Sequence, residues 1–123
     1  MKSGLSMNKG TLIVSKYKTS VLIAEDTVDQ SVGLMYREPP LPHMVFPYKN
    51  AGVNRFWMLN TKAPLDIVFC HENKIVQICK GEAYSTKLVG DDDIISDLVI
   101  EFPFGTCTKM GITIGDDVRL LKE

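Results

Sequence analysis

The stretch "NRFWMLNTKAPLDIVF", residues 54–69, decides the fold that we predict for this chain. Apolar side chains dominate on both sides of "NTKAP", and Pro64 cannot continue a central strand, so the stretch is typical of two β-strands that meet at a corner. Asn60, Thr61 and Asp66 nevertheless place polar groups between the apolar blocks. Because buried polar groups need hydrogen-bond partners, these three residues either build the corner or belong to a site.

On both sides of this stretch, short runs of β-branched and apolar residues indicate further strands. We expect about eight strands, over residues 11–15, 20–25, 43–48, 53–59, 65–70, 75–79, 98–103 and 115–121. Turns are predicted at "KNAG" (49–52) and "HENK" (71–74), and a long loop over 82–93.

Two short helices interrupt the strand pattern. In "DTVDQSVGLMYRE", Thr27 and Gln30 fit a capping box, and Gly33 lies where a helix of about two turns would end. In "GTCTKMG", Thr106 would cap one helical turn that Gly111 ends.

The predicted fold class is therefore mainly β with minor α, a small antiparallel barrel-like or two-layer sheet with two short helices. Parallel doubly wound folds need long crossover helices, which the sequence lacks. We expect a flexible segment over residues 1–10 and a single compact domain over 11–123.

Composition limits the partners that we expect. The chain has 14 basic and 15 acidic side chains and no long basic run, so nucleic acid is not an expected partner. No apolar run approaches the roughly 20 residues that span a bilayer, so no membrane partner is expected. The opening "MKSGLSMNKG" lacks the apolar core of a signal peptide, which predicts a cytoplasmic protein.

Cysteine and histidine spacing predicts neither a metal site nor a cofactor. The chain has three cysteines, Cys70, Cys79 and Cys107. Their odd number and the absence of Cys-x-x-Cys spacing favour reduced, buried thiols over a disulfide framework. His43 and His71 do not complete a zinc pattern, and "GDDD" at 90–93 lacks the alternating ligands of a calcium loop.

The candidate site lies in residues 54–69. Strand alternation would place Phe56, Met58 and Asn60 on one face and Trp57 and Thr61 on the other. One interpretation makes all of them core, with Asn60 and Thr61 bonded to local backbone. In the other, Trp57 and Asn60 line the mouth of a pocket.

Asp66 is the best candidate for a catalytic residue. It follows Leu65 in a strongly apolar strand, where an unpaired carboxylate would be costly to bury. It could accept hydrogen bonds from the corner backbone, or serve as an acid, a base or a ligand contact with a raised pKa. A bidentate ion pair between Asp66 and Arg37 would compensate the charge of each side chain.

Three motifs together resemble the family known as domain of unknown function 192: "GLMYRE" (33–38), "FWMLNTKAPLDIVF" (56–69) and "GITIGDDV" (111–118). The resemblance covers roughly residues 20–120 and implies a compact, mainly β, barrel-like single domain without an established activity. Many relatives look exported, whereas the opening residues of this sequence predict no such amino-terminal segment. The family positions carried by this sequence are Gly33, Leu34, Met35, Arg37, Phe56, Trp57, Met58, Asn60, Thr61, Pro64, Leu65 and Asp66.

The function that we expect is a binding or accessory module for a small molecule or an extended peptide, in an oligomeric state that the sequence leaves open. The alternative is an enzyme in which Asp66 is the general acid or base and Asn60 or Arg37 stabilises an anion. The predicted binding residues are Trp57, Met58, Asn60, Thr61, Asp66, Arg37, Met35 and Tyr84.

Overall fold

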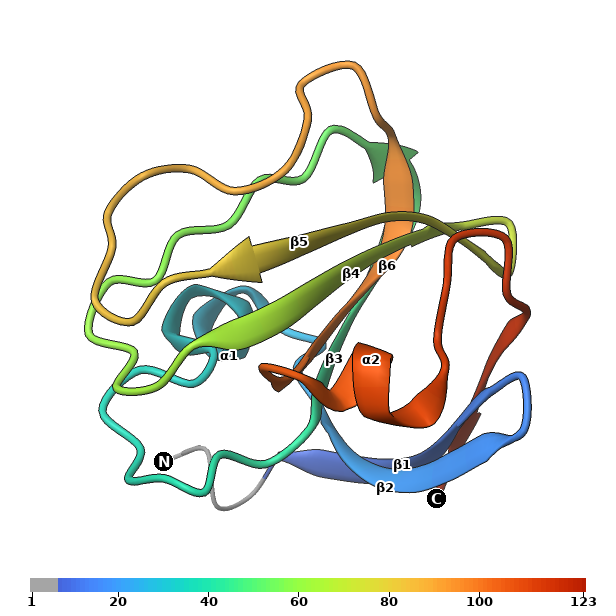
Figure 1. Cartoon of the computed structure of the whole chain (residues 1–123), viewed down its shortest axis with the longest axis horizontal. Helices are drawn as coiled ribbons and strands as arrows, with labels where there is room; N and C mark the ends of the chain where they lie inside the picture. Colours follow the sequence, from blue (N-terminus) through green and yellow to red (C-terminus); the bar gives the residue numbers. More distant parts are fainter. Residues whose placement is uncertain (1–6) are drawn as a thin grey trace.

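The computed structural model describes residues 7–123, which form one curved sheet with two short helices (Figure 1). The elements are β1 (Asn8–Val14), β2 (Tyr17–Ile23), α1 (Thr27–Val32), β3 (Met44–Gly52), β4 (Leu65–His71), β5 (Lys74–Gly81), β6 (Ser96–Pro103), α2 (Thr106–Met110) and β7 (Val118–Lys122). The mainly β prediction with two short helices is confirmed.

The sheet has seven strands in the order β5-β4-β6-β3-β2-β1-β7. Every pairing is antiparallel except the short one between β2 and β3. The sheet is not closed into a barrel, so of the two predicted forms the structure allows the two-layer sheet and not a closed barrel. Its edge strands approach only near the β4–β5 turn, where Ile75 N–H donates to Asp116 O (3.0 Å) and Val118 N–H donates to Asn73 O (2.9 Å).

Two antiparallel hairpins join consecutive strands, β1 with β2 and β4 with β5. Glu72 and Asn73 join β4 to β5 with φ of 50° and 66°, as the two-residue turn of a twisted hairpin requires. β1 starts earlier than the strand predicted over 11–15, because it begins at Asn8. The predicted flexible segment at 1–10 falls partly on residues 1–6, which lie outside the described residues.

Two predictions around the central stretch are wrong. The turn expected at 49–52 is the end of β3. The strand expected at 53–59 is an extended segment whose one bridge joins Phe56 to Val89 in the long loop. Because the segment pairs with a loop, it forms no continuous ladder, although Val53, Arg55 and Trp57 still alternate outward.

The helices end where expected but begin differently. Asp26, not Thr27, caps α1, and its side chain accepts from Asp29 N–H at 2.7 Å. Gly33 ends α1 with a φ of 52°, a conformation that favours glycine. Gly105, not Thr106, precedes α2, and the capping residue itself supplies no side-chain bond.

The core has two parts, one on each face of the sheet. The α2 side packs residues such as Val68, Ile100 and Cys107. The α1 side packs neighbours such as Ile67, Val99 and Leu34. Alternation along the central strands sends adjacent residues to opposite parts, so both faces of β4 and β6 are covered.

Neither of the two helices that the structure describes is long and apolar enough to cross a membrane.

Candidate functional site

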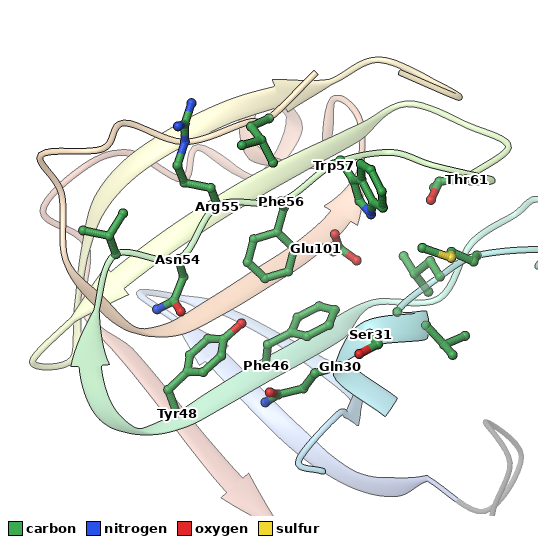
Figure 2. A pocket seen from close by; sticks show the side chains of 16 residues that line it. Gln30, Ser31, Phe46, Tyr48, Asn54, Arg55, Phe56, Trp57, Thr61 and Glu101 are labelled. Atoms are coloured by element: carbon green, nitrogen blue, oxygen red, sulfur yellow. The ribbon is translucent and has the colours of Figure 1, made fainter. Parts of the chain in front are cut away.

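A cleft of about 500 Å³ lies between α1, β3 and the extended segment after β3 (Figure 2). The residues that line it are Gln30, Ser31, Val32, Gly33, Leu34, Met35, Phe46, Tyr48, Val53, Asn54, Arg55, Phe56, Trp57, Thr61, Leu88 and Glu101. The cleft therefore opens on the α1 side of the sheet and borders one of the two core regions.

Aromatic rings form much of the cleft wall. Phe46 and Phe56 meet edge to face, with ring centroids 5.0 Å apart, and Phe56 also contacts Phe69 behind it at 6.1 Å. Trp57 is 46% exposed, and Tyr48 adds a phenol (Figure 2). Such a wall offers a ligand apolar area together with ring faces that attract positive charge.

Glu101 places a carboxyl group in this cleft. Its side chain comes from the middle of β6, opposite Met44 of β3 and Ile67 of β4, and the residue is only 4% exposed. Figure 2 shows the carboxyl group among Phe56, Trp57 and Thr61. Within residues 7–123 it accepts no hydrogen bond and joins no ion pair. Burial without compensation raises the pKa of Glu101 to about 8.

Other polar groups around Glu101 are fixed or remote from the base of the cleft. The Gln30 amide donates to Ala24 O (2.9 Å) and Pro47 O (3.0 Å), which ties α1 to the sheet. Arg55 is exposed, and its Nε donates to Gly90 O at 3.1 Å. Burial and the charge of Glu101 raise the pKa of Tyr48, so this phenol stays neutral near pH 7.

The end of α1 approaches the carboxyl group closely. A Cβ built on Gly33 would lie 3.5 Å from the Phe46 ring and 3.9 Å from Glu101 Oε1. Gly33 also has a left-handed φ, so a larger residue would strain the helix end as well as fill the cleft. This glycine of the predicted "GLMYRE" motif therefore shapes the cleft.

Three of the eight predicted binding residues, Met35, Trp57 and Thr61, line the cleft. The other five do not: Arg37, Met58, Asn60, Asp66 and Tyr84. The structure therefore brings three of the predicted residues together at this cleft and places the other five elsewhere.

Asp66 has a structural role in this geometry. Its Oδ2 accepts from the backbone N–H groups of Gly105 (3.1 Å) and Cys107 (2.9 Å), at the start of α2. The expected partner, the backbone of the corner loop, is not the one that it uses. The hypothetical pair with Arg37 is also wrong, since no ion pair joins the two side chains in residues 7–123.

Asn60 and Met58 support the corner. Asn60 has a left-handed φ of 55°, its amide donates to the Tyr36 hydroxyl at 2.8 Å, and its carbonyl accepts from Tyr36 N–H. Met58 is fully buried in the core beneath the cleft region. Tyr84 is 59% exposed in the long loop, and its N–H donates to Thr61 O. These contacts fasten three irregular segments together.

Sequence reasoning missed Glu101, as well as Phe46 and Tyr48. The signal for Glu101 was present in "LVIEFP", because a carboxylate inside an apolar strand is the same anomaly that singled out Asp66. Phe46 and Tyr48 carry no comparable signal, since alternate aromatic residues in a strand are ordinary core.

A second cavity and a run of three aspartates lie outside this cleft. A second cavity of about 510 Å³ is lined by His43, and its charged residues Lys9 and Glu123 are exposed. Burial lowers the pKa of His43, whose Nδ1 lies 2.9 Å from Thr19 Oγ1. In residues 7–123 the one cluster of three potential metal ligands is the exposed run Asp91–Asp93.

The profile of a family described as DUF192, Uncharacterized ACR, matches residues 10–120. None of the curated proteins compared with the chain matches it.

Two crystal structures have the same architecture. A candidate transcription regulator from Sinorhizobium meliloti 1021 is 26% identical, with a TM-score of 0.86, over 94% of this chain and 95% of the other. A protein of unknown function from Novosphingobium aromaticivorans DSM 12444 is 25% identical, with a TM-score of 0.78, over 89% and 83%. The fold is therefore shared over nearly the whole chain.

Proposed function

This chain belongs to the DUF192 family, and from that premise we propose that it binds a small organic molecule in the cleft between α1 and the sheet. The observation that carries the proposal is Glu101, a buried carboxyl group that has no protein partner in residues 7–123 and faces a cleft with aromatic walls. A protein gains nothing in stability from such a group, whereas a ligand could compensate it.

The shape of the cleft supports a small ligand over an extended peptide. Its volume of about 500 Å³ lies within the range of small-molecule sites, and apolar and aromatic residues surround a few polar groups. A peptide that adds to a sheet would need an open edge strand, but the cleft lies over the face of β3 and β6.

The relative described as a candidate transcription regulator suggests a different role, which we do not extend to this chain. Its 14 basic and 15 acidic side chains leave no excess of positive charge, and Arg55 is the one basic residue of the cleft. The proposal accordingly includes neither nucleic acid nor a membrane as partner.

Catalysis is a second candidate, and the pKa of Glu101 favours it. A carboxyl group with a pKa of about 8 can give or take a proton near neutral pH. The role would then belong to Glu101 rather than to Asp66, whose oxygen is bound to backbone. A ligand recovered unchanged after long incubation with the protein would favour binding alone.

The test is a screen of small aromatic molecules by ¹H–¹⁵N NMR. We expect ligands to shift the signals of Gly33, Phe56 and the Trp57 indole. Val32→Phe should fill the cleft and weaken binding by about tenfold or more, because Val32 lines it at the end of α1.

Val28→Phe is the matched control. Val28 lies on the same helix, is 68% exposed and does not line the cleft, so its variant should bind as the original protein does. Equal binding by the two variants, or a library in which no member shifts the cleft residues, would overturn the proposed function.

A further inference from the structure

We propose that the ligand of this cleft carries an organic cation, an ammonium group that is held between the Glu101 carboxylate and the aromatic wall. This inference rests on the proposed binding function and names the chemical class of the ligand. It is carried by three observations: an unpartnered carboxyl group, aromatic rings around it, and a single basic lining residue, Arg55, whose Nε is bonded to Gly90 O away from the carboxyl group.

The first observation is the charge that Glu101 can supply. Asp66, buried to a similar degree on the neighbouring strand, receives two backbone N–H groups, whereas Glu101 receives none within residues 7–123. Any ammonium group would attract the carboxylate electrostatically, and one that carries N–H groups would also donate hydrogen bonds to the carboxylate oxygens. Charged pairs shielded from water are strong.

The second observation is the wall. Phe46, Phe56, Tyr48 and Trp57 surround the approach to Glu101 (Figure 2). Ring faces attract cations, and an ammonium group fits such a cage better than an anion, which the ring faces and the carboxylate would repel.

The third observation is the position of the one basic side chain of the cleft. Arg55 is exposed, and its Nε is bound to Gly90 O, so it does not occupy the base of the cleft. No ion pair in the described part of the chain includes Arg55 or Glu101. The site is therefore open to a positive group from a ligand.

A cation would bind the ionised carboxylate, so affinity must depend on pH. The titratable or charged groups that line the cleft with Glu101 are Tyr48 on β3 and Arg55 in the extended segment. The side chains that α1 contributes to the cleft lining are all uncharged. Asp29 of the same helix is buried but does not line the cleft. On β4, the residue opposite Glu101 is Ile67, which is apolar. Tyr48 stays neutral near pH 7, because burial and the charge of Glu101 raise its pKa, which leaves Glu101 to titrate.

The experiment compares choline with its neutral isostere 3,3-dimethylbutan-1-ol by NMR titration of the cleft residues. We expect choline to bind about tenfold tighter or more. Its affinity should rise between about pH 6 and pH 9, by up to about a hundredfold, as the binding-competent ionised fraction grows. Choline keeps its charge throughout, so the ligand does not contribute to this dependence.

Two variants test whether Glu101 causes the preference for choline and its pH dependence. Glu101→Gln should abolish both the preference for choline and the pH dependence. Glu72→Gln removes a carboxylate in the exposed β4–β5 turn, outside the cleft, and should preserve both.

Equal affinity for the two probes, or failure of choline to bind while molecules of the screen still shift the cleft, would overturn the inference and leave the binding function intact. Affinity that falls as pH rises would also overturn it, since that sign indicates a protonated Glu101 donating to a neutral or anionic ligand. If neither choline nor any molecule of the screen shifts the signals of the cleft residues, the proposed function itself is overturned.

Discussion

Asp66 and Glu101 lie on neighbouring strands and are both almost fully buried, yet only one of them is compensated. Asp66 points to the α2 side of the sheet and accepts two backbone N–H groups there. Glu101 points to the α1 side and meets apolar and aromatic groups. At the scale of the residue, the presence of nearby donors is what separates a compensated carboxyl group from an uncompensated one.

Glu101 should make the protein less stable as pH rises. Its pKa is raised from 4.5 to about 8 on folding, so the folded state holds a proton that the unfolded state releases. Stability from this group is complete below about pH 4.5 and declines until about pH 8. The loss is a few kcal/mol, since one pKa unit corresponds to about 1.4 kcal/mol.

Urea unfolding at several pH values, compared between the original protein and Glu101→Gln, measures this loss. The glutamine variant should show a smaller decline and should be the more stable protein at about pH 9. Groups such as His43 titrate in both proteins, so they cancel in the comparison. Parallel stability curves for the two proteins would show that Glu101 is not buried as described.

At the scale of the element, α2 depends on a residue far away in the sequence. The helix has only five residues, and Gly105 before it has no side chain with which to cap the first N–H groups. Asp66 supplies that cap from β4, and the acceptor also carries the negative charge that a helix start favours. The motif "LDIVF" therefore stabilises a helix that is encoded about 40 residues later.

Asp66→Asn should destabilise the protein by about 1–3 kcal/mol, because one buried charged acceptor of two N–H groups is lost. Its binding of cleft ligands should not change. The control is Asp97→Asn, which alters a more exposed carboxylate that accepts one backbone N–H group, from Glu72. Unfolding in urea measures stability, and the NMR titration measures binding. If the Asp66→Asn variant folds but no longer binds the cleft ligands, Asp66 has a role in binding.

At the scale of the whole molecule, the two parts of the core share β3, β4 and β6. The side chains of these strands alternate between the parts, so neither part can open without disturbing strands that the other needs. We therefore expect cooperative unfolding, with buried groups on both faces becoming accessible together.

The cysteines test this expectation. Cys70 and Cys107 belong to the α2 side of the core, and burial raises the pKa of each thiol to about 12. In a Cys79→Ser variant, which lacks the less buried thiol, labelling by a disulfide reagent at about pH 8 should be slow. The free energy of opening obtained from the labelling rates of Cys70 and Cys107 should match the free energy of global unfolding. Rapid labelling of Cys70 in the native protein would contradict a single cooperative core.

The amino-acid sequence was sufficient to predict the mainly β class, the approximate positions of all seven strands, both helix ends and the family motif. These features follow from local patterns: alternating apolar residues, turn residues and glycines with left-handed backbone. The false strand at 53–59 has the same alternation, but its partner is a loop rather than a strand, and alternation does not identify the partner.

Which of the two buried carboxyl groups lacks hydrogen-bond donors is apparent only from the three-dimensional structure. Asp66 and Glu101 look alike in the sequence, each in an apolar strand. Asp66 is compensated by N–H groups 39 and 41 residues away, brought to it by the path from β6 into α2. Every residue except proline carries the same backbone N–H, so no side-chain pattern reveals where these donors will lie. The fold alone positions them, and it positions none at Glu101 within the described chain.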